Sequence, residues 1–528
     1  MGADRDDPVL FPVRGISQRL DNDDPNYQAG VPDIYIALAL AYDSLAAPAM
    51  SIDASGIASP DYTAMQPRLA LSWNEQENGD WIVRLRPGVR SQAGNELTAE
   101  DIAWVFRKAY AHETLSSWRW RQVVGVEKVE ALDRYTVRYR LRSPYPTFPN
   151  WLLPVTPNIV DSTEIRAHAT PEDPWGIQWL NSNVAGFGPY ALAQMDADHL
   201  LFQARDDYWA GRSETARVEV GTAPDRASAI RLLDEKRPVV IVGLDPDEIA
   251  HLSKRDDLTL HRVWAGHVSI EVNFTRPPFD NPAVRHALAF ATPYDRIIRD
   301  GLLGLARPWH SPAKGTSQWG SCGHRHYEEN PAKARELLAR AGFAQGLKAD
   351  LHIDRRPDCQ RMGEIIADAW RRVGVELTLK DAAGLPAGEL PELLLRTDCA
   401  HNLSEPIYDI AHDYAAMSQI LPAPGGPRGV GTWNPRWEKN DEAIGRFADL
   451  LLEPDAGRKR QRFDELQSYL VDFSSSIFLA EVQYATAQNS QVPRSFLTAN
   501  TRPFHAFQYQ NCISDFYLPL RHPTGSNG

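Results

Sequence analysis

The chain carries little positive charge. Its 528 residues include 56 Lys and Arg against 69 Asp and Glu, so the formal net charge is 56 − 69 = −13. Nucleic acids and anionic membranes need a basic protein surface, because their phosphates have to be neutralised. No nucleic-acid partner is therefore expected. The total balance still leaves room for a locally basic cleft.

Long hydrophobic runs are also missing. The sequence has no run of about 18 apolar residues, the length that a membrane-spanning helix needs. The N-terminus carries Asp4, Asp6 and Asp7, whereas a secretory signal begins with positive charge. We therefore expect no signal sequence within this chain, either because it has been removed or because the start codon lies upstream of Met1.

Cysteine is scarce, and none of it occurs as Cys-x-x-Cys. The four cysteines are Cys322, Cys359, Cys399 and Cys512. An even number in an exported protein fits one or two disulfides, and buried thiols are the alternative. Cys322, His324 and His326 have a spacing at which sulfur and imidazole could hold a metal. Because no second pair of ligands accompanies them, we favour a solvated loop and expect no metal.

Motifs of nucleotide binding and hydrolysis are absent too. The chain has no Gly-Lys dipeptide of a P-loop, no His-Glu-x-x-His and no Gly-x-Ser-x-Gly. Gly186, Gly188 and Ala191 superficially fit a dinucleotide fingerprint, but Pro189 directly follows the second glycine and breaks the pattern. We expect a backbone turn that lines a cleft there. No ordered catalytic triad is found, so neither enzymatic activity nor a cofactor is expected.

What the sequence does contain is an alternation of strand and helix patterns, which indicates an α/β fold. The clearest unit begins with a short strand at 349–353. An apolar helix stripe follows at 362–373, Gly374 ends the helix, and a second strand covers 375–379. This β-α-β order predicts a crossover between parallel strands. A third strand is expected at 393–396.

Helix starts and aromatic residues add to this pattern. Thr98 is expected to cap a helix, as are Asn281 and Asn330, each of which precedes a proline. Gly342 is expected just beyond the end of the third of these helices. The chain also has 15 Trp. Most Trp pack in cores, but a minority is expected to line a ligand cleft, where flat rings bind sugars or peptides.

Several motifs then follow one another in an order that resembles a known family. The first group comprises residues 66–73, 81–89, Gly94 and 97–102. The second comprises 186–190 and 207–209, the third 273–274, 278–280, 284–288 and 295–296, and the last Arg458, Gln467 and 476–478. Together they resemble the family 5 extracellular solute-binding proteins of bacterial ABC importers, which include oligopeptide- and dipeptide-binding proteins.

This resemblance implies a fold of two α/β lobes with a ligand cleft between them, of the periplasmic-binding-protein type II with an extra inserted subdomain. The first lobe is expected to be discontinuous, from residues 1–50, 183–264 and 486–528. The inserted subdomain would cover 51–182, and the second lobe 265–485. Two crossing strands would let the lobes close over a ligand, by rotation near 264–266 and 484–487.

The same resemblance implies a transport function. Such a protein captures a small-molecule solute and delivers it to the transmembrane subunits of an ABC permease. A periplasmic or other extracytoplasmic location and a monomer are expected. Three alternative functions are an enzyme, a sugar-responsive regulator with an added DNA-binding segment, and a peptide holdase. The first lacks a triad and the second lacks a basic helix-turn-helix within residues 1–50.

The sequence departs from the family pattern in a segment that binds the ligand in oligopeptide-binding proteins. Residues 398–406 resemble the signature Trp-Cys-Ala-Asp-Tyr-x-Glu-Pro of oligopeptide binders, in which the aspartate pairs with the ligand's α-ammonium group. Here His401 replaces that aspartate, and Asp398 replaces the tryptophan. Neutral imidazole accepts only one hydrogen bond, and imidazolium would repel an ammonium group. We therefore expect an oligosaccharide, an opine-type sugar conjugate or a sugar phosphodiester. Peptides are the alternative, with Asp398, Glu405 or Asp409 as the anchor.

The residues predicted to bind the ligand are Phe187, Gly188, Trp264, Arg355, Arg356, His401, Asn402 and Trp433. Arg355 and Arg356 leave the end of a strand and enter a helix N-terminus, a common place for an anion, although a solvated loop is the alternative. Cys359 and Cys399 both follow strands of the predicted sheet, so a disulfide between them is expected. The resemblance instead suggests a partner for Cys399 near residue 268, where no cysteine stands.

Overall fold

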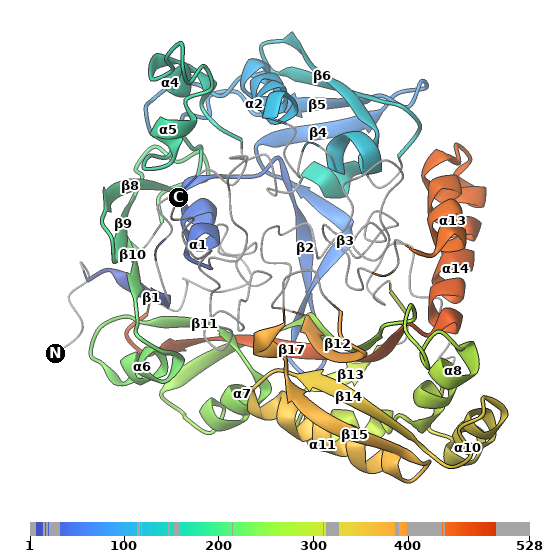
Figure 1. The fold of residues 1–528 in the computed structure, drawn as a ribbon. Coiled ribbons are helices and arrows are strands. Elements are labelled where there is room, and N and C mark those ends of the chain that lie inside the picture. The colour runs from blue at the N-terminus through green and yellow to red at the C-terminus, as the bar shows by residue number, and fades with distance from the viewer. Residues whose placement is uncertain are drawn as a thin grey trace, which may run out of the picture.

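The structure is a computed structural model of the chain. It describes residues 7–13, 16, 20, 32–112, 117, 119–145, 148–152, 159–213, 215–309, 311–312, 327–385, 390–398, 436 and 439–492. Within them, the chain forms three β-sheets with flanking helices (Figure 1).

Two of the sheets have four strands each within the described ranges. The first contains, in spatial order, β1 (Val9–Val13), β10 (Arg217–Thr222), β9 (His199–Ala204) and β8 (Tyr190–Met195). The second contains β4 (Ala70–Glu75), β5 (Trp81–Leu85), β7 (Thr136–Leu141) and β6 (Val126–Asp133), and its neighbouring strands are antiparallel. The second sheet lies at the top of Figure 1, beside α2 (Ala99–His112).

The largest sheet has nine strands among the described residues. Its main path is β11 (Val240–Leu244), β17 (Ser476–Asn489), β12 (Leu258–Val272), β16 (Leu393–Asp398), β14 (Leu347–Ile353) and β15 (Val375–Asp381). The strands off this path are β2 (Ala46–Ile52), β3 (Ala58–Pro67) and β13 (Ala306–Pro308). In Figure 1, β12 and β17 cross the lower half of the molecule from one side to the other.

Helices of varied length connect and cover these strands. Besides α2, the α-helices described in the first half are α1 (Pro32–Ala41), α4 (Ser162–Ala167), α5 (Ile177–Leu180), α6 (Arg226–Arg231) and α7 (Pro246–Leu252). Those in the second half are α8 (Pro282–Ala291), α9 (Tyr294–Arg296), α10 (Pro331–Arg340), α11 (Pro357–Arg371), α13 (Asp441–Leu452) and α14 (Ala456–Phe473). Shorter 3-10 or π-helical turns are η1 (Arg119–Val124), η2 (Phe148–Leu152), η3 (Leu232–Asp234), η4 (Ile297–Gly301) and η5 (Ala382–Gly384). No described helix is long and apolar enough to cross a membrane.

The predicted β-α-β unit is confirmed. Strands β14 and β15 pair in parallel, with Leu347 opposite Val375 and Leu351 opposite Leu379. Helix α11 connects them and buries the predicted apolar stripe, which includes Trp370. The third predicted strand, β16, is parallel to β14. Hydrophobic periodicity found this unit because each element buries a single face.

Two of the three expected helix caps, Asn281 and Asn330, are confirmed. The hydroxyl of Thr98 instead donates to Asp101 Oδ2 at 3.0 Å. The side chain of Asn281 accepts a hydrogen bond from the backbone of Ala283 at the start of α8, and that of Asn330 accepts one from Lys333 at the start of α10. Gly342 lies just beyond the end of α10 with φ at 92°, a left-handed conformation that glycine adopts without steric cost.

Two long antiparallel strands connect the lobes. Strands β12 and β17 pair along almost their whole lengths, from Leu258 opposite Asn489 to Glu271 opposite Ser476. One end of this ribbon packs in a cluster of buried residues with α6 and α7, and the other end packs in a separate cluster with α8 and α11. We call the parts built on these clusters the first and the second lobe. The pairing register shifts between Trp264 and Gly266, so an extra residue enters β12 there.

A hairpin ties the second four-stranded sheet to this ribbon. All seven residues of β2 pair with β3, and Ala58 of β3 pairs with Val263 of β12. The predicted lobe boundaries at 264/265 and 485/486 fall inside the continuous strands β12 and β17. Each of these two strands therefore contributes residues to both lobes. The division into residues 1–50, 51–182, 183–264, 265–485 and 486–528 stays a prediction.

Candidate functional site

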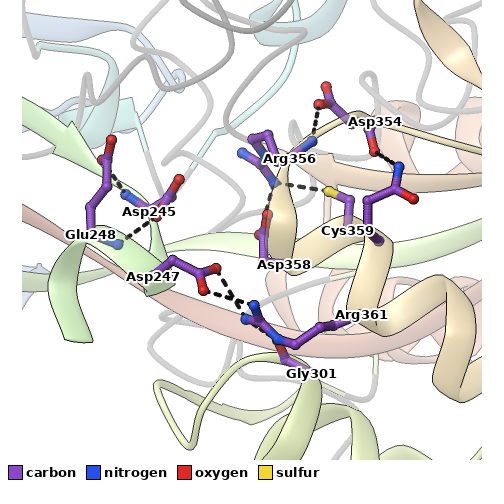
Figure 2. A network of polar contacts seen from close by, with 10 residues as sticks. Asp245, Asp247, Glu248, Gly301, Asp354, Arg356, Asp358, Cys359 and Arg361 are labelled. Atoms are coloured by element: carbon purple, nitrogen blue, oxygen red, sulfur yellow. Dashed lines mark hydrogen bonds and ion pairs between the residues drawn. The ribbon is translucent and has the colours of Figure 1, made fainter. Parts of the chain in front are cut away.

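Two helix N-termini from different lobes meet beside the connecting ribbon (Figure 2). Helix α7 follows strand β11 in the first lobe, and Asp245 caps it. Helix α11 follows strand β14 in the second lobe, with Arg356 at its N-cap position. Ligands of α/β proteins bind at the carboxyl ends of strands, where helices begin. The meeting of two such ends marks this region as the centre of the candidate site.

Arg356 is buried rather than exposed at this meeting point. Its side chain is 2% accessible, and its Nη2 lies 3.1 Å from Asp358 Oδ2 and donates to Cys359 Sγ at 3.4 Å. Its Nε and Asp358 Oδ1 are buried without a hydrogen-bond partner among the described residues. Burial alone would lower the pKa of Arg356, but the nearby carboxylate of Asp358 raises it well above the usual range. The arginine therefore keeps its charge, and Asp358 neutralises it.

Asp245 belongs to the same group of charges. Its side chain is 1% exposed, and its Oδ1 accepts a hydrogen bond from the backbone of Glu248 at 2.8 Å. Burial, together with the negative charges of Glu248 and Asp358, raises the pKa of Asp245 to about 7. The opposing effect of Arg356 is smaller. The charge of this buried carboxyl group therefore changes near neutral pH.

Trp264 lies where the hairpin, the ribbon and β13 meet. Its Nε1 donates to Asp53 Oδ2 at 3.0 Å, in the turn between β2 and β3. The guanidinium of Arg307 lies 4.6 Å from the centroid of the indole ring, and Arg307 Nε donates to Glu481 Oε2 at 2.6 Å. The side chain of Glu481 is 5% exposed. Trp264 is thus held by a carboxylate at its edge and by a cation against its ring.

Phe187 and Gly188 lie at a close contact with the end of helix α1. The backbone N–H of Gly188 donates to the carbonyl of Ala41 at 2.9 Å. A Cβ atom at Gly188 would lie 2.5 Å from the carbonyl carbon of Ala41, and one at Gly186 would lie 1.9 Å from its oxygen. Phe187 is fully buried in a hydrophobic cluster. The glycines of this motif are therefore explained by backbone contact with α1.

The remaining predicted ligand residues are distributed differently. Arg355 has a side chain that is 69% exposed, and it forms an ion pair with Asp381. His401, Asn402 and Trp433 lie outside the described residues, as do Cys322, Cys399 and Cys512. The Cys359–Cys399 disulfide therefore stays a prediction. Burial raises the pKa of the Cys359 thiol to about 12.

A buried polar cluster that the sequence did not predict joins two of the family motifs. Asp43 follows helix α1 and forms an ion pair with Arg68, whose Nε lies 2.6 Å from Asp43 Oδ1. Tyr208 and Trp209, from the motif at 207–209, donate to Asp43 Oδ2 at 2.6 and 2.9 Å. The cluster therefore joins the end of α1 to the motif at 66–73 and to the motif at 207–209. The sequence had singled out Tyr208 and Trp209 as motif residues, but Asp43 lies in none of the motifs.

The described residues include no group of three or more His, Cys, Asp and Glu side chains that could hold a metal ion. The polar groups that they do bring together are arginines, carboxylates and one indole. Such groups bind and orient polar molecules through hydrogen bonds and stacking.

Comparison with known proteins agrees with this arrangement. The sequence profile of the bacterial extracellular solute-binding proteins, family 5, matches residues 64–387. The chain belongs to this family. Two relatives within family 5 are heme-binding protein A of Haemophilus influenzae and glutathione-binding protein GsiB of Pectobacterium atrosepticum. The first is 25% identical over 338 residues, which are 60% of this chain and 61% of that protein. The second is 23% identical over 447 residues, 82% of this chain and 83% of that protein.

Solved structures show the same two-lobed fold for family 5. The ABC transporter substrate-binding protein CtaP of Listeria monocytogenes has a TM-score of 0.73 at 17% identity, covering 92% of this chain and 94% of CtaP. DppA of Helicobacter pylori, in complex with the peptide STSA, has a TM-score of 0.69 at 19% identity, covering 96% and 98%. AgaA of A. tumefaciens R10, in complex with agropinic acid, has a TM-score of 0.68 at 18% identity, covering 95% and 97%.

Proposed function

We propose that this chain is the substrate-binding protein of an ABC importer. It captures a polar small solute between its lobes and delivers it to the transmembrane subunits of a permease, outside the cytoplasm. The observation that carries this function is membership of family 5 over residues 64–387, on a two-lobed fold. The described residues support binding rather than turnover, because they position charges and a tryptophan beside the inter-lobe ribbon.

For the ligand, we propose a neutral or anionic polar compound such as an oligosaccharide, an opine-type sugar conjugate or a sugar phosphodiester. The supporting observation is His401, which stands where peptide binders carry the aspartate that pairs with an α-ammonium group. A buried ammonium group without its counter-charge would cost several kcal/mol. The named ligands within family 5 include heme, glutathione, a peptide and agropinic acid, so the family alone leaves this choice open.

The arginines contribute unequally to this proposal. Arg356 is already neutralised by Asp358, so it adds little free positive charge. Arg355 is exposed and would have to exchange Asp381 for an anionic group of the ligand. Guanidinium binds carboxylates and phosphates through two parallel hydrogen bonds. A ligand with one carboxylate or phosphate suits this single exchangeable arginine.

The test begins with native mass spectrometry of the purified protein, which identifies any compound that co-purifies. Calorimetry then compares a panel of oligosaccharides, opines and sugar phosphodiesters with a library of di- to pentapeptides. We expect micromolar binding of at least one member of the first panel. Peptide binding that disappears on N-acetylation would contradict the ligand proposal, and absence of any saturable ligand would contradict the transport function.

Peptides remain the second candidate, because Asp398 ends strand β16 and so lies at the carboxyl end of a second-lobe strand. In that case the carboxylate of Asp398, rather than His401, would bind the ammonium group. An Asp398→Asn variant separates the two ligand proposals. It should abolish peptide binding if peptides are the ligands, and it should leave sugar or opine binding within about twofold otherwise.

A further inference from the structure

One ion pair connects the two helices that meet at the ribbon. Asp247, in the first turn of α7, faces Arg361 of α11 (Figure 2). Nη1 and Nη2 of Arg361 lie 2.7 and 3.1 Å from the two carboxylate oxygens of Asp247. The pair is therefore bidentate, which is the geometry in which a guanidinium binds a carboxylate most strongly. Both side chains are about one third exposed, at 31% and 32%.

Arg361 is fixed within its own lobe before it reaches the other. Its Nε and Nη2 donate to the carbonyl of Gly301 at 3.2 and 2.8 Å. Gly301 ends η4, which packs against α11: a Cβ atom at this glycine would lie 2.8 Å from the side chain of Met362. The guanidinium is thus anchored on the second lobe and presents its remaining N–H groups to the first.

The two helices belong to separate cores. Ile249 and Leu252 of α7 pack in the first-lobe cluster, whereas Met362 and Ile366 of α11 pack in the second-lobe cluster. Rotation of one lobe against the other therefore moves Asp247 relative to Arg361. The side-chain contact between them is a contact across the joint rather than within one rigid core.

Electrostatics explain why acidic residues lie at this joint. The N-terminus of a helix carries a partial positive charge, so two approaching N-termini repel each other. Asp247 and Glu248 lie in the first turn of α7, and Asp358 lies in the first turn of α11. These carboxylates neutralise the two helix ends and allow them to approach. Arg361, one turn further along α11, then converts this neutralised contact into an attractive one.

We propose that Asp247 and Arg361 form an inter-lobe latch that stabilises the observed packing of α7 against α11 and thereby sets the distribution of lobe orientations. Rotation that separates the two helices breaks the latch. Because the pair is partly exposed, its effect is modest: exposed pairs contribute roughly 0.2–1 kcal/mol, which changes the ratio of two orientations about 1.4- to 5-fold. Its consequence for ligand affinity rests on the proposed transport function, but its effect on orientation does not.

The test measures the distance between the two helices without any ligand. A ketone-bearing amino acid is introduced at His251 of α7 and Glu364 of α11, both exposed, and each is coupled to a nitroxide. Pulsed electron–electron double resonance then gives the distribution of distances between the two nitroxides. In Arg361→Gln and in Asp247→Asn, we expect an increased population of longer distances. The double variant should add little to either single change, because both remove the same contact.

The matched control is Arg255→Gln. Arg255 also forms a bidentate pair, with Asp257 at 3.0 and 2.5 Å, but both residues lie in the first lobe between α7 and β12. This variant should leave the distance distribution unchanged. The charge exchange Asp247→Arg with Arg361→Asp should move the distribution back toward that of the unmodified protein. Unchanged distances in both single variants, or additive effects in the double variant, would overturn the latch, whatever the outcome of the ligand assays.

Discussion

The hydroxyl of Tyr208 donates a hydrogen bond of 2.6 Å to the carboxylate of Asp43, which is 165 residues away in the chain. The same carboxylate is paired with Arg68, whose side chain is 11% exposed. Burial alone would lower the pKa of Arg68, but Asp43 raises it above its usual range. Asp43 and residues of two family motifs thus form one buried charge cluster.

Removal of the Asp43 side chain should therefore strongly destabilise the folded protein. Asp43→Ala removes the carboxylate that pairs with the largely buried Arg68, and we expect a loss of about 3–5 kcal/mol in the free energy of unfolding. Tyr208→Phe should cost less, about 1.5–3 kcal/mol. It removes the hydrogen bond to Asp43 and the longer one, of 3.2 Å, that the hydroxyl accepts from Arg68 Nη2, but it keeps the ion pair. Denaturant unfolding followed by circular dichroism measures both changes.

The control for this prediction is Glu442→Ala. Glu442 pairs with Arg446 on the surface of α13, and both side chains are well exposed. Such pairs contribute about 0.3–0.5 kcal/mol. If Asp43→Ala and Glu442→Ala shifted the unfolding midpoint equally, the structural role given to Asp43 would be wrong.

A methyl group at Gly188 should be poorly tolerated. Its Cβ would lie within 2.7 Å of three backbone atoms of Ala41 and Tyr42, which cannot move without shifting the end of α1. We expect Gly188→Ala to destabilise the protein by about 3 kcal/mol or more. Gly445→Ala, in the exposed part of α13, should instead stabilise it by about 0.5–1 kcal/mol, because no atom lies within 4 Å of the new Cβ. Thermal melts of the two variants should shift in opposite directions.

Asp245 should make stability depend on pH. Its pKa is raised from 3.8 to about 7 in the folded protein, so the folded state holds the proton more tightly than the unfolded state does. Stability from this group is therefore present at pH 4 and is lost as the pH rises to about 7. Asp245→Asn should remove that loss. Measured by chemical denaturation, its stability relative to the unmodified protein should rise by a few kcal/mol between pH 4 and pH 8.

Asp225→Asn serves as the control, because the stability that Asp225 contributes should depend on pH in the opposite direction. Asp225 is exposed, caps α6, and has a pKa lowered chiefly by the hydrogen bond from the backbone of Ser228. Its stabilising effect is present above its unfolded pKa and is lost as the pH falls. Parallel pH profiles for the two asparagine variants would contradict the raised pKa of Asp245.

Ligand binding should both compact and stabilise the protein. If the lobes rotate near residues 264–266 and 484–487, closure buries surface at the ribbon and reduces the radius of gyration. A ligand at a hundredfold excess over its Kd should add about 2.7 kcal/mol to the free energy of unfolding. Small-angle scattering and calorimetry with the co-purifying compound test both effects. An unchanged scattering profile at saturation would rule out closure.

Local sequence patterns predicted helices and strands of the second lobe, but they could not predict side-chain contacts between residues that are distant in the chain. The unit from 347 to 381 was found because its helix and strands each bury one face and end at Gly374. Arg356 was predicted to bind an anionic group of the ligand, but Asp358 in the first turn of α11 pairs with it, and both side chains are 2% exposed. The partners of Asp43 are 25 and 165 residues away, so no local spacing could have shown them.

Each lobe builds its core partly on strands that continue into the other. The 15 residues of β12 and the 14 of β17 pass through both clusters of buried residues. If one lobe unfolded alone, half of each strand would lose its hydrogen-bonded partner and its apolar contacts. The other lobe would then lose part of the sheet on which its own core is built. The two lobes should therefore lose their structure as one cooperative unit, with a calorimetric enthalpy equal to the van't Hoff enthalpy, even if they rotate against each other in the folded state.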